Sequence, residues 1–139
     1  MSVPVNQRTQ GKLDVCVKAH DLCCYTLHIT RNKNVFDEAY KDPLTDKIVE
    51  CAIEIHTLVW SANNVLVKDA ASYEARRRMQ DSAASKCNIL LSLIDLAWGI
   101  FHLRASRVAY WSKKTIEVRN LIRAWRDSDA NRYKNKFGM

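Results

Sequence analysis

Residues that interrupt helices are scarce in this chain, which has three glycines and two prolines among 139 residues. Hydrophobic residues make up 47% of the sequence and charged residues 27%, a balance typical of long amphipathic helices and not of turn-rich β proteins. The length corresponds to one domain. We therefore expect a single-domain, all-α protein.

Four segments show the alternating three-and-four spacing of apolar residues that is typical of amphipathic helices. We expect helices over residues 13–31, 43–67, 72–103 and 107–130. Helices of this length with short connections favour an antiparallel up-down-up-down four-helix bundle. The expected organisation is a flexible lead (residues 1–12), the bundle domain (13–130) and a basic, mobile tail (131–139).

Each expected helix has one apolar stripe that should face the core. In the first helix it comprises Leu13, Val17, His20, Cys24 and Leu27, and in the second Ile48, Ala52, Ile55, Val59, Ala62 and Leu66. In the third it comprises Leu90, Ile94, Ala97 and Phe101, and in the fourth Trp111, Thr115, Val118, Ile122 and Trp125. Phe36 and Tyr40, in the first loop, should pack back against the bundle. The candidate N-caps are Asp42 for the second helix, Asp69 or Ser72 for the third, and Ser106 for the fourth.

The third helix has a second apolar stripe beside the first, made of Ile89, Leu93, Leu96, Ile100 and Leu103. Together the two stripes exceed the ~100° that packing on a single core requires. We therefore expect this helix to be buried on two sides, with the second side against another subunit.

The net charge of +7 is confined to the C-terminal quarter of the chain. Residues 1–103 contain twelve Lys and Arg against twelve Asp and Glu, whereas residues 104–136 contain ten against three. A charge concentrated in one element indicates a surface for a polyanion.

Arg119, Arg123 and Arg126 are our main candidates for phosphate contact, because they lie at i, i+4 and i+7 on one helix face. Arginine also suits phosphate through its bidentate fork. The further candidates for nucleic-acid binding are Arg104, Arg107, Lys113, Lys114 and Arg77. For the triplet Arg76-Arg77-Arg78, a solvated helix face and phosphate contact are about equally supported, with at least one member turned inward or toward an interface.

The sequence offers no catalytic constellation, so we expect neither an enzyme nor a cofactor. Cys16, His20, Cys24 and His28 recur every fourth residue, but they span about 18 Å of helix and cannot share one ion. We interpret them as packing residues and assign no metal site. The N-terminus has no signal pattern, no apolar run approaches ~18 residues, and five cysteines in helical patterns suit a reducing compartment. We expect a cytoplasmic protein that does not enter a membrane.

The identity and spacing of several residues resemble those of a known protein family. They are Leu22, Tyr25, Phe36, Tyr40, Leu44-Thr45-x-x-Ile48, Ala62-Asn63, Arg77-x-x-Gln80-x-x-Ala83 and Trp125. The pattern, over about residues 13–128, is similar to the four-helix bundle proteins that include the accessory variability determinant of diversity-generating retroelements. Their relatives are encoded in intervening sequences of bacterial large-subunit ribosomal RNA genes.

Two departures bear on this resemblance. Family members often have glycines before the last tryptophan, where this chain has Arg123 and Ala124, which could alter how the last helix packs. The ribosomal relatives tend to have a proline-containing turn where this chain has Ser61-Ala62-Asn63-Asn64, and its absence favours the retroelement branch.

The resemblance implies a non-enzymatic, homopentameric barrel that binds nucleic acid with little sequence preference and associates with a reverse transcriptase. In that setting it would bind template RNA, and also DNA, to support mutagenic cDNA synthesis. The alternative is a structural protein interaction module whose basic helix docks on an acidic protein surface. Membrane-surface binding by the tail is a weaker third hypothesis, because the tail lacks a sustained apolar face.

Overall fold

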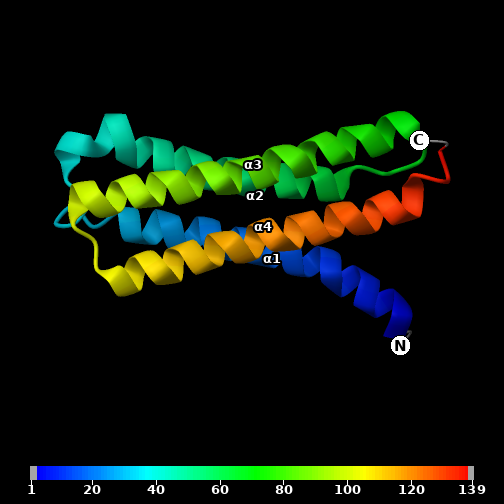
Figure 1. Cartoon of the computed structure of the whole chain (residues 1–139), viewed down its shortest axis with the longest axis horizontal. Coiled ribbons are helices and arrows are strands. Elements are labelled where there is room, and N and C mark those ends of the chain that lie inside the picture. The colour runs from blue at the N-terminus through cyan, green and yellow to red at the C-terminus, as the bar shows by residue number, and fades with distance from the viewer. Residues whose placement is uncertain (1–2, 138–139) are drawn as a thin grey trace.

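The computed structural model describes residues 3–137, with side chains from Asp14 onward, and within that range it is helical with no strand. The long helices are α1 (Val3–Thr30), α2 (Asp46–Asn64), α3 (Ala70–Phe101) and α4 (Ala105–Tyr133). Figure 1 shows them running side by side along the longest axis. The all-α prediction is confirmed. The first helix begins at Val3 and not at residue 13, so residues 3–12 of the expected lead are helical, although their side chains are not described.

The four helices enclose one core. Contacts join α1 to α2, α2 to α3, α3 to α4 and α4 back to α1. The α1–α2 and α3–α4 connections lie at one end and the α2–α3 connection at the other (Figure 1). Each helix contributes fully buried aliphatic side chains, represented by Leu22, Ile55, Leu90 and Ile122. Burial of such side chains from water is the main stabilising term of a fold like this.

The inward side of α1 differs from the prediction. Val17 is 51% exposed and Leu27 37% exposed, His20 is also exposed and Cys24 is half-buried, while Leu13 falls outside the described side chains. The residues that reach the core instead are Val15, Cys16, Ala19, Leu22, Cys23 and Thr26. Because α1 is apolar around much of its circumference, two stripes have the helical period. The stripe that contains Thr26 faces the core, where that side chain bonds a buried tryptophan.

The loop between α1 and α2 is folded against the bundle. It contains a 3-10 turn (Glu38–Tyr40) and a π-helical turn (Lys41–Thr45), so α2 begins at Asp46 and the expected Asp42 cap is not formed. Phe36 is 3% exposed and its ring centroid lies 4.8 Å from that of Phe101. Tyr40 contacts the same ring at 5.8 Å. The prediction that both aromatic residues pack back is confirmed.

Most of the inward stripe predicted for α2 is buried, from Ile48 to Ala62. Leu66 is 78% exposed, because α2 ends at Asn64, earlier than the expected end at Val67. The C-terminal part of the predicted stripe is therefore wrong.

The start of α3 confirms one of the proposed caps. Asp69 accepts a hydrogen bond from the Ser72 backbone N–H at 2.8 Å, and the Ser72 hydroxyl accepts one from the Asp69 N–H at 3.0 Å. This reciprocal capping box satisfies donors that the first helical turn leaves free. At the other end, His102 adopts a left-handed conformation, with φ 53°, and ends the helix.

The start and end of α4 differ from the prediction. Ser106 lies inside α4, and the N-cap is Arg104, whose side chain makes no capping bond. The helix continues to Tyr133, so the first three residues of the expected tail are helical. Tyr133 then contacts Tyr73 of α3, with ring centroids 5.7 Å apart.

The second apolar stripe of α3 lies largely at the surface of the single chain. Ile89, Leu96 and Ile100 are 43%, 51% and 37% exposed, Leu93 is half-buried and only Leu103 is buried. By length and composition alone, α3 is the one helix in the described residues that could cross a membrane, and 22% of its most apolar stretch is buried. A single such helix is weak evidence for a membrane span. The rest of the chain therefore leaves most of the second apolar stripe of α3 uncovered, and the burial expected there is not observed in the single chain.

Trp111, near the start of α4, anchors this helix to the C-terminal part of α1 in the bundle interior. Its side chain is fully buried and the indole N–H donates to Thr26 Oγ1 at 3.0 Å. Thr26 in turn donates to the Leu22 carbonyl at 2.8 Å. A buried donor needs such a partner, because leaving it unsatisfied costs its full desolvation penalty.

Replacing Thr26 with valine should lower the free energy of unfolding by about 1 to 3 kcal/mol, since the indole N–H loses its acceptor. The matched control is Thr57→Val, which changes an exposed α2 threonine whose hydroxyl bonds the Glu54 carbonyl. Urea denaturation followed by circular dichroism measures both. Equal destabilisation of the two variants would contradict an anchoring role for the Thr26 bond.

Candidate nucleic-acid interface

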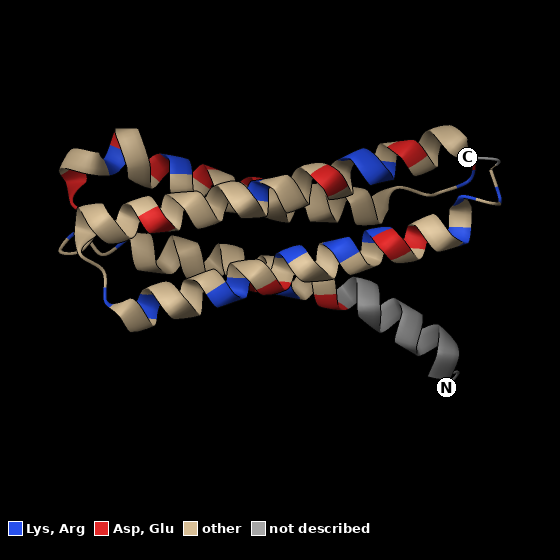
Figure 2. Ribbon diagram, viewed as in Figure 1, with Lys and Arg blue, Asp and Glu red and all other residues tan. Residues whose placement is uncertain are grey.

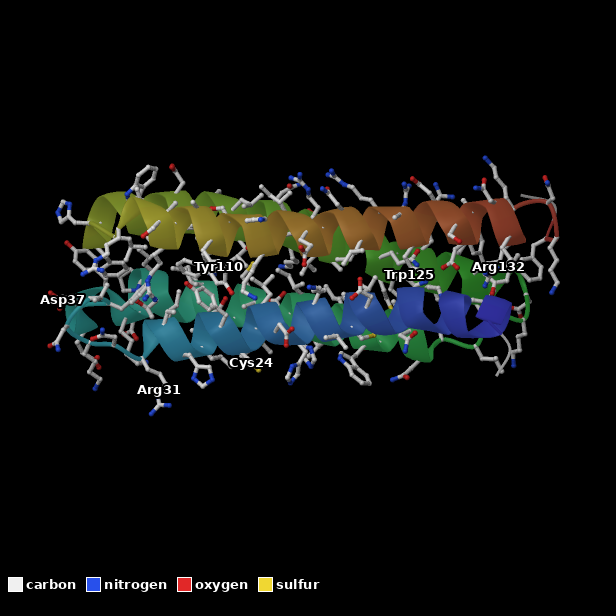
Figure 3. All side chains as sticks on the ribbon, turned by 90° about the horizontal axis from the view of Figure 1, so that it is seen from below. Cys24, Arg31, Asp37, Tyr110, Trp125 and Arg132 are labelled. Carbon is white, nitrogen blue, oxygen red and sulfur yellow. The ribbon has the colours of Figure 1, made fainter. Side chains whose placement is uncertain are left out.

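The orientation of α4 follows from its buried stripe. All five predicted residues are buried, with exposed fractions from 0% for Trp111 and Thr115 to 7% for Trp125. Figure 3 shows Trp125 between the ribbons of α1 and α4. With this stripe turned inward, the helical period sends the neighbouring positions to the sides that meet α3 and α1.

Arg119, Arg123 and Arg126 form an arginine ladder along one face of α4. Two of these three arginines contact α3. Arg119 donates from Nη1 to Asn88 Oδ1 at 2.9 Å, and Arg126 forms an ion pair with Asp81. Arg123 is exposed and has no ion pair within the described part of the chain. The ladder therefore lies along the seam between α3 and α4. Its three members differ in how free they are to meet a ligand.

The other candidate cations do not join this ladder in one patch. Lys114 lies on the opposite side of α4, where its Nζ is 5.1 Å from the ring centroid of Tyr110 and 5.8 Å from that of Tyr25 in α1. Lys113 is exposed, Arg104 and Arg107 lie at the start of α4, and Arg77 is half-buried on α3. Figure 2 shows cations along much of α4, whereas the half of α3 near the α3–α4 turn is nearly free of them.

Arg76 is the member of the arginine triplet that turns inward. It is 4% exposed, and its guanidinium approaches Asp129, itself 1% exposed, at 3.3 Å. Gln80 also donates to Asp129, at 2.9 Å, while Arg76 Nη2 donates to the Val65 carbonyl at 2.7 Å. The guanidinium carbon lies 5.8 Å from the Trp125 ring centroid. Helices α2, α3 and α4 thus meet at one buried charged cluster, and Arg76 is not available to a ligand.

Asp129 was absent from the predicted inward stripe, although the sequence contains a signal for it. It follows Ile122 and Trp125 at i+7 and i+4, so it continues the same stripe by one step. Because Asp129 neutralises Arg76 in the interior, the segment 104–136 retains ten cations against Glu117 and Asp127 outside the core. The outer side of α4 is therefore more basic than the linear charge count indicates.

Three of the histidine and cysteine residues, His20, Cys24 and His56, lie close together. His20 contacts Cys24 Sγ at 3.7 Å and stacks edge-on with His56 at 5.7 Å. No group of three or more His, Cys, Asp or Glu suited to a metal occurs among the described side chains. In Figure 3, Cys24 points away from α4. Burial lowers the pKa of His56, and the neighbouring His20 adds to this effect.

All five cysteines are free thiols. Burial raises the pKa of Cys51 to about 11 and that of Cys87 to about 12. The pKa values of Cys16 and Cys23 are also raised by burial. These four thiols are therefore protonated near neutral pH, which leaves little of the thiolate that nucleophilic or metal-binding chemistry needs.

Comparisons with known proteins give no match to a protein-family model, a curated protein or a solved structure.

Replacing Asp129 with asparagine should lower the free energy of unfolding by about 3 to 5 kcal/mol, because the buried Arg76 charge loses its partner. The adjacent control is Asp127→Asn, on the exposed side of the same helix. The double variant Arg76→Met/Asp129→Asn should recover part of the loss, because no buried charge then remains. Denaturant unfolding measures all three, and equal effects of D129N and D127N would contradict the buried pair.

Proposed function

We propose that this chain is a non-catalytic, cytoplasmic accessory subunit of a diversity-generating retroelement. It binds template RNA, and its cDNA, through the basic side of α4, and it associates with the reverse transcriptase to support mutagenic cDNA synthesis. The observation that carries the nucleic-acid part is the confinement of the net positive charge to residues 104–136, that is, to α4 with its N-cap and the residues after it. The retroelement setting rests on the resemblance of the packing residues described above.

Electrostatics favours a polyanion as the ligand of this side. Lys and Arg that neutralise phosphates release counterions, which provides affinity without reading sequence. Arg123 is exposed and has no ion pair among the described residues, and the side-chain partners of Arg119 are the neutral amides of Asn88 and Asn120. Both guanidiniums therefore keep a charge that a phosphate can neutralise.

We further propose that the chain forms an antiparallel up-down-up-down bundle that assembles into a homopentameric barrel. The exposed stripe of Ile89, Leu96 and Ile100 supports an assembly, because contiguous apolar side chains at a surface mark interaction sites. Five copies would also multiply the charge presented to one nucleic-acid strand.

The alternative is an interaction module that docks an acidic protein surface on the basic helix. The Arg126–Asp81 ion pair favours this alternative, since it shows that the ladder position already accommodates a carboxylate. The two hypotheses predict similar sensitivity to salt. They differ in whether bulk RNA displaces the bound partner.

The triple variant Arg119→Gln/Arg123→Gln/Arg126→Gln should bind single-stranded RNA more weakly than the unmodified chain. Losing three phosphate contacts should also make the slope of log K against log salt shallower by about 2. The matched control, Arg31→Gln/Lys47→Gln/Lys68→Gln, removes the same charge from exposed positions outside α4. Fluorescence anisotropy over a salt series measures both variants, with circular dichroism to confirm their helicity.

Equal losses in the two triple variants would show that only net charge matters and would overturn the assignment of the interface. Unchanged affinity in the ladder variant would overturn it as well. If the chain binds an acidic protein that bulk RNA does not displace, and does not bind RNA, the docking alternative holds.

The variant Leu96→Asp should convert an oligomer into monomers, because it places a charge in the middle of the exposed apolar stripe. Leu66→Asp is the control, since Leu66 is 78% exposed in the α2–α3 connection and outside the stripe. Analytical ultracentrifugation at micromolar concentration measures the mass of each. A monomeric unmodified chain, or an oligomer that persists in L96D, would remove this stripe as the subunit contact.

A further inference from the structure

A cavity of about 440 Å³ lies at the end of the bundle where the α1–α2 loop meets the α3–α4 turn. Its volume falls within the range of small-molecule sites, roughly 300 to 1,000 Å³. Two of the predicted cations, Arg104 and Arg107, line it, together with His102, Asn32 and Asn34. These two arginines thus belong to a different site from the ladder of Arg119, Arg123 and Arg126, which lies farther along α4.

The charge in this cavity is not compensated by acids. None of its described lining residues is acidic, and neither Arg104 nor Arg107 has an ion pair within residues 14–137. A second cavity of about 440 Å³ is different, because its Lys33 pairs with Glu38 at 3.7 Å and its Lys41 with Asp46 at 3.1 Å. The second cavity is also lined by Arg31, but its two lysines are paired with acids, whereas no cation of the first cavity has an ion pair among the described residues.

The backbone explains why both arginines reach the same cavity. The left-handed His102 ends α3, the chain turns, and α4 starts with Arg104 as its N-cap and Arg107 in its first turn. Cations are disfavoured at a helix N-terminus, and this first turn contains no acid to offset them. A bound anion would relieve the repulsion between the two guanidiniums and the helix dipole.

The rest of the lining fits an organic group beside the anion. Ile29, Val35, Phe36 and Phe101 provide apolar surface, and aromatic side chains such as Phe101 can stack on a base. The Asn32 side-chain oxygen is engaged by the Asn34 backbone N–H at 3.1 Å, which leaves the Asn32 amide nitrogen as a donor. Free phosphate would use the arginines and leave this surface without a role.

The geometry points to a nucleotide site in this cavity that takes a terminal phosphomonoester together with its base. Such a phosphate carries a charge of about −1.5 to −2, which two arginines match better than they match the single charge of a diester within a strand. The ligand is a free nucleoside monophosphate or the phosphorylated end of a strand. The strand source rests on the proposed nucleic-acid function and specifies which part of the strand this end of the bundle binds.

The test uses the full chain and four probes: adenosine 5′-monophosphate, inorganic phosphate, and one RNA sequence with either a 5′-phosphate or a 5′-hydroxyl. We expect the monophosphate to bind more tightly than inorganic phosphate. Arg104→Gln/Arg107→Gln should weaken monophosphate binding at least about 10-fold, since both charged hydrogen bonds are lost. Lys33→Gln/Lys41→Gln, in the cavity of equal volume, is the control and should bind as the unmodified chain does. Isothermal titration calorimetry measures the affinities, with circular dichroism to confirm folding.

The RNA probes separate the two sources. A strand end as ligand requires tighter binding of the 5′-phosphorylated RNA and loss of that preference in R104Q/R107Q. Monophosphate binding without any RNA binding would retain the site and remove the nucleic-acid function. RNA binding that ignores the 5′-phosphate, with no monophosphate binding, would remove the site and retain the function. Equal affinity for monophosphate and inorganic phosphate, or an unchanged affinity in R104Q/R107Q, would overturn the nucleotide site.

Discussion

The buried pair of Arg76 and Asp129 constrains the arrangement of three helices, because neither charge can remain in the interior without the other. The guanidinium lies 3.3 Å from the carboxylate and also donates to the Val65 carbonyl just after α2, at 2.7 Å. Gln80 satisfies the carboxylate from one helical turn farther along α3. A rotation of α4 or a shift of its register would break these bonds together, so the cluster sets which sides of α3 and α4 face outward.

With α3 held in this rotation, its contact with the basic side of α4 and its exposed apolar stripe occupy different parts of its outward face. Asn88 contacts Arg119 of α4, whereas Lys86 pairs with Glu54 of α2 at 2.9 Å. The half-buried Leu93 and the exposed Ile100 follow Lys86 at i+7 and i+14, so this edge of the apolar stripe lies on the Lys86 side. The basic seam is on the α4 side, and the apolar stripe extends from the middle of the outward face of α3 toward the α2 side. The proposed subunit contact on the stripe would therefore leave the seam open to the proposed nucleic-acid ligand.

The cations of α4 then divide into two physical types. Those of the ladder lie on an open seam and act on any polyanion that passes, with an energy that salt screens. Arg104 and Arg107 are exposed too, but they line a cavity with a partly apolar wall, where two guanidiniums and an apolar surface can act on one group. The first type suits affinity without selectivity, and the second suits recognition of one small group. Counting the basic residues of α4 does not distinguish the cations on the seam from those that line the cavity.

How far the sequence predicts the molecule depends on how many apolar stripes a helix has. On α4 one stripe dominates, and all five residues from Trp111 to Trp125 are buried as expected. On α1 two stripes compete, and the local helical period could not reveal that Thr26 would be held inward by Trp111, a residue far along the chain.

The pairing of charges is equally hidden from the local sequence, because Asp81 and Asp129 reach their arginines across helices. Whether a cation is free is decided by its neighbours in space. The ladder could therefore be located from the sequence, but the different availability of Arg123 and Arg126 could not.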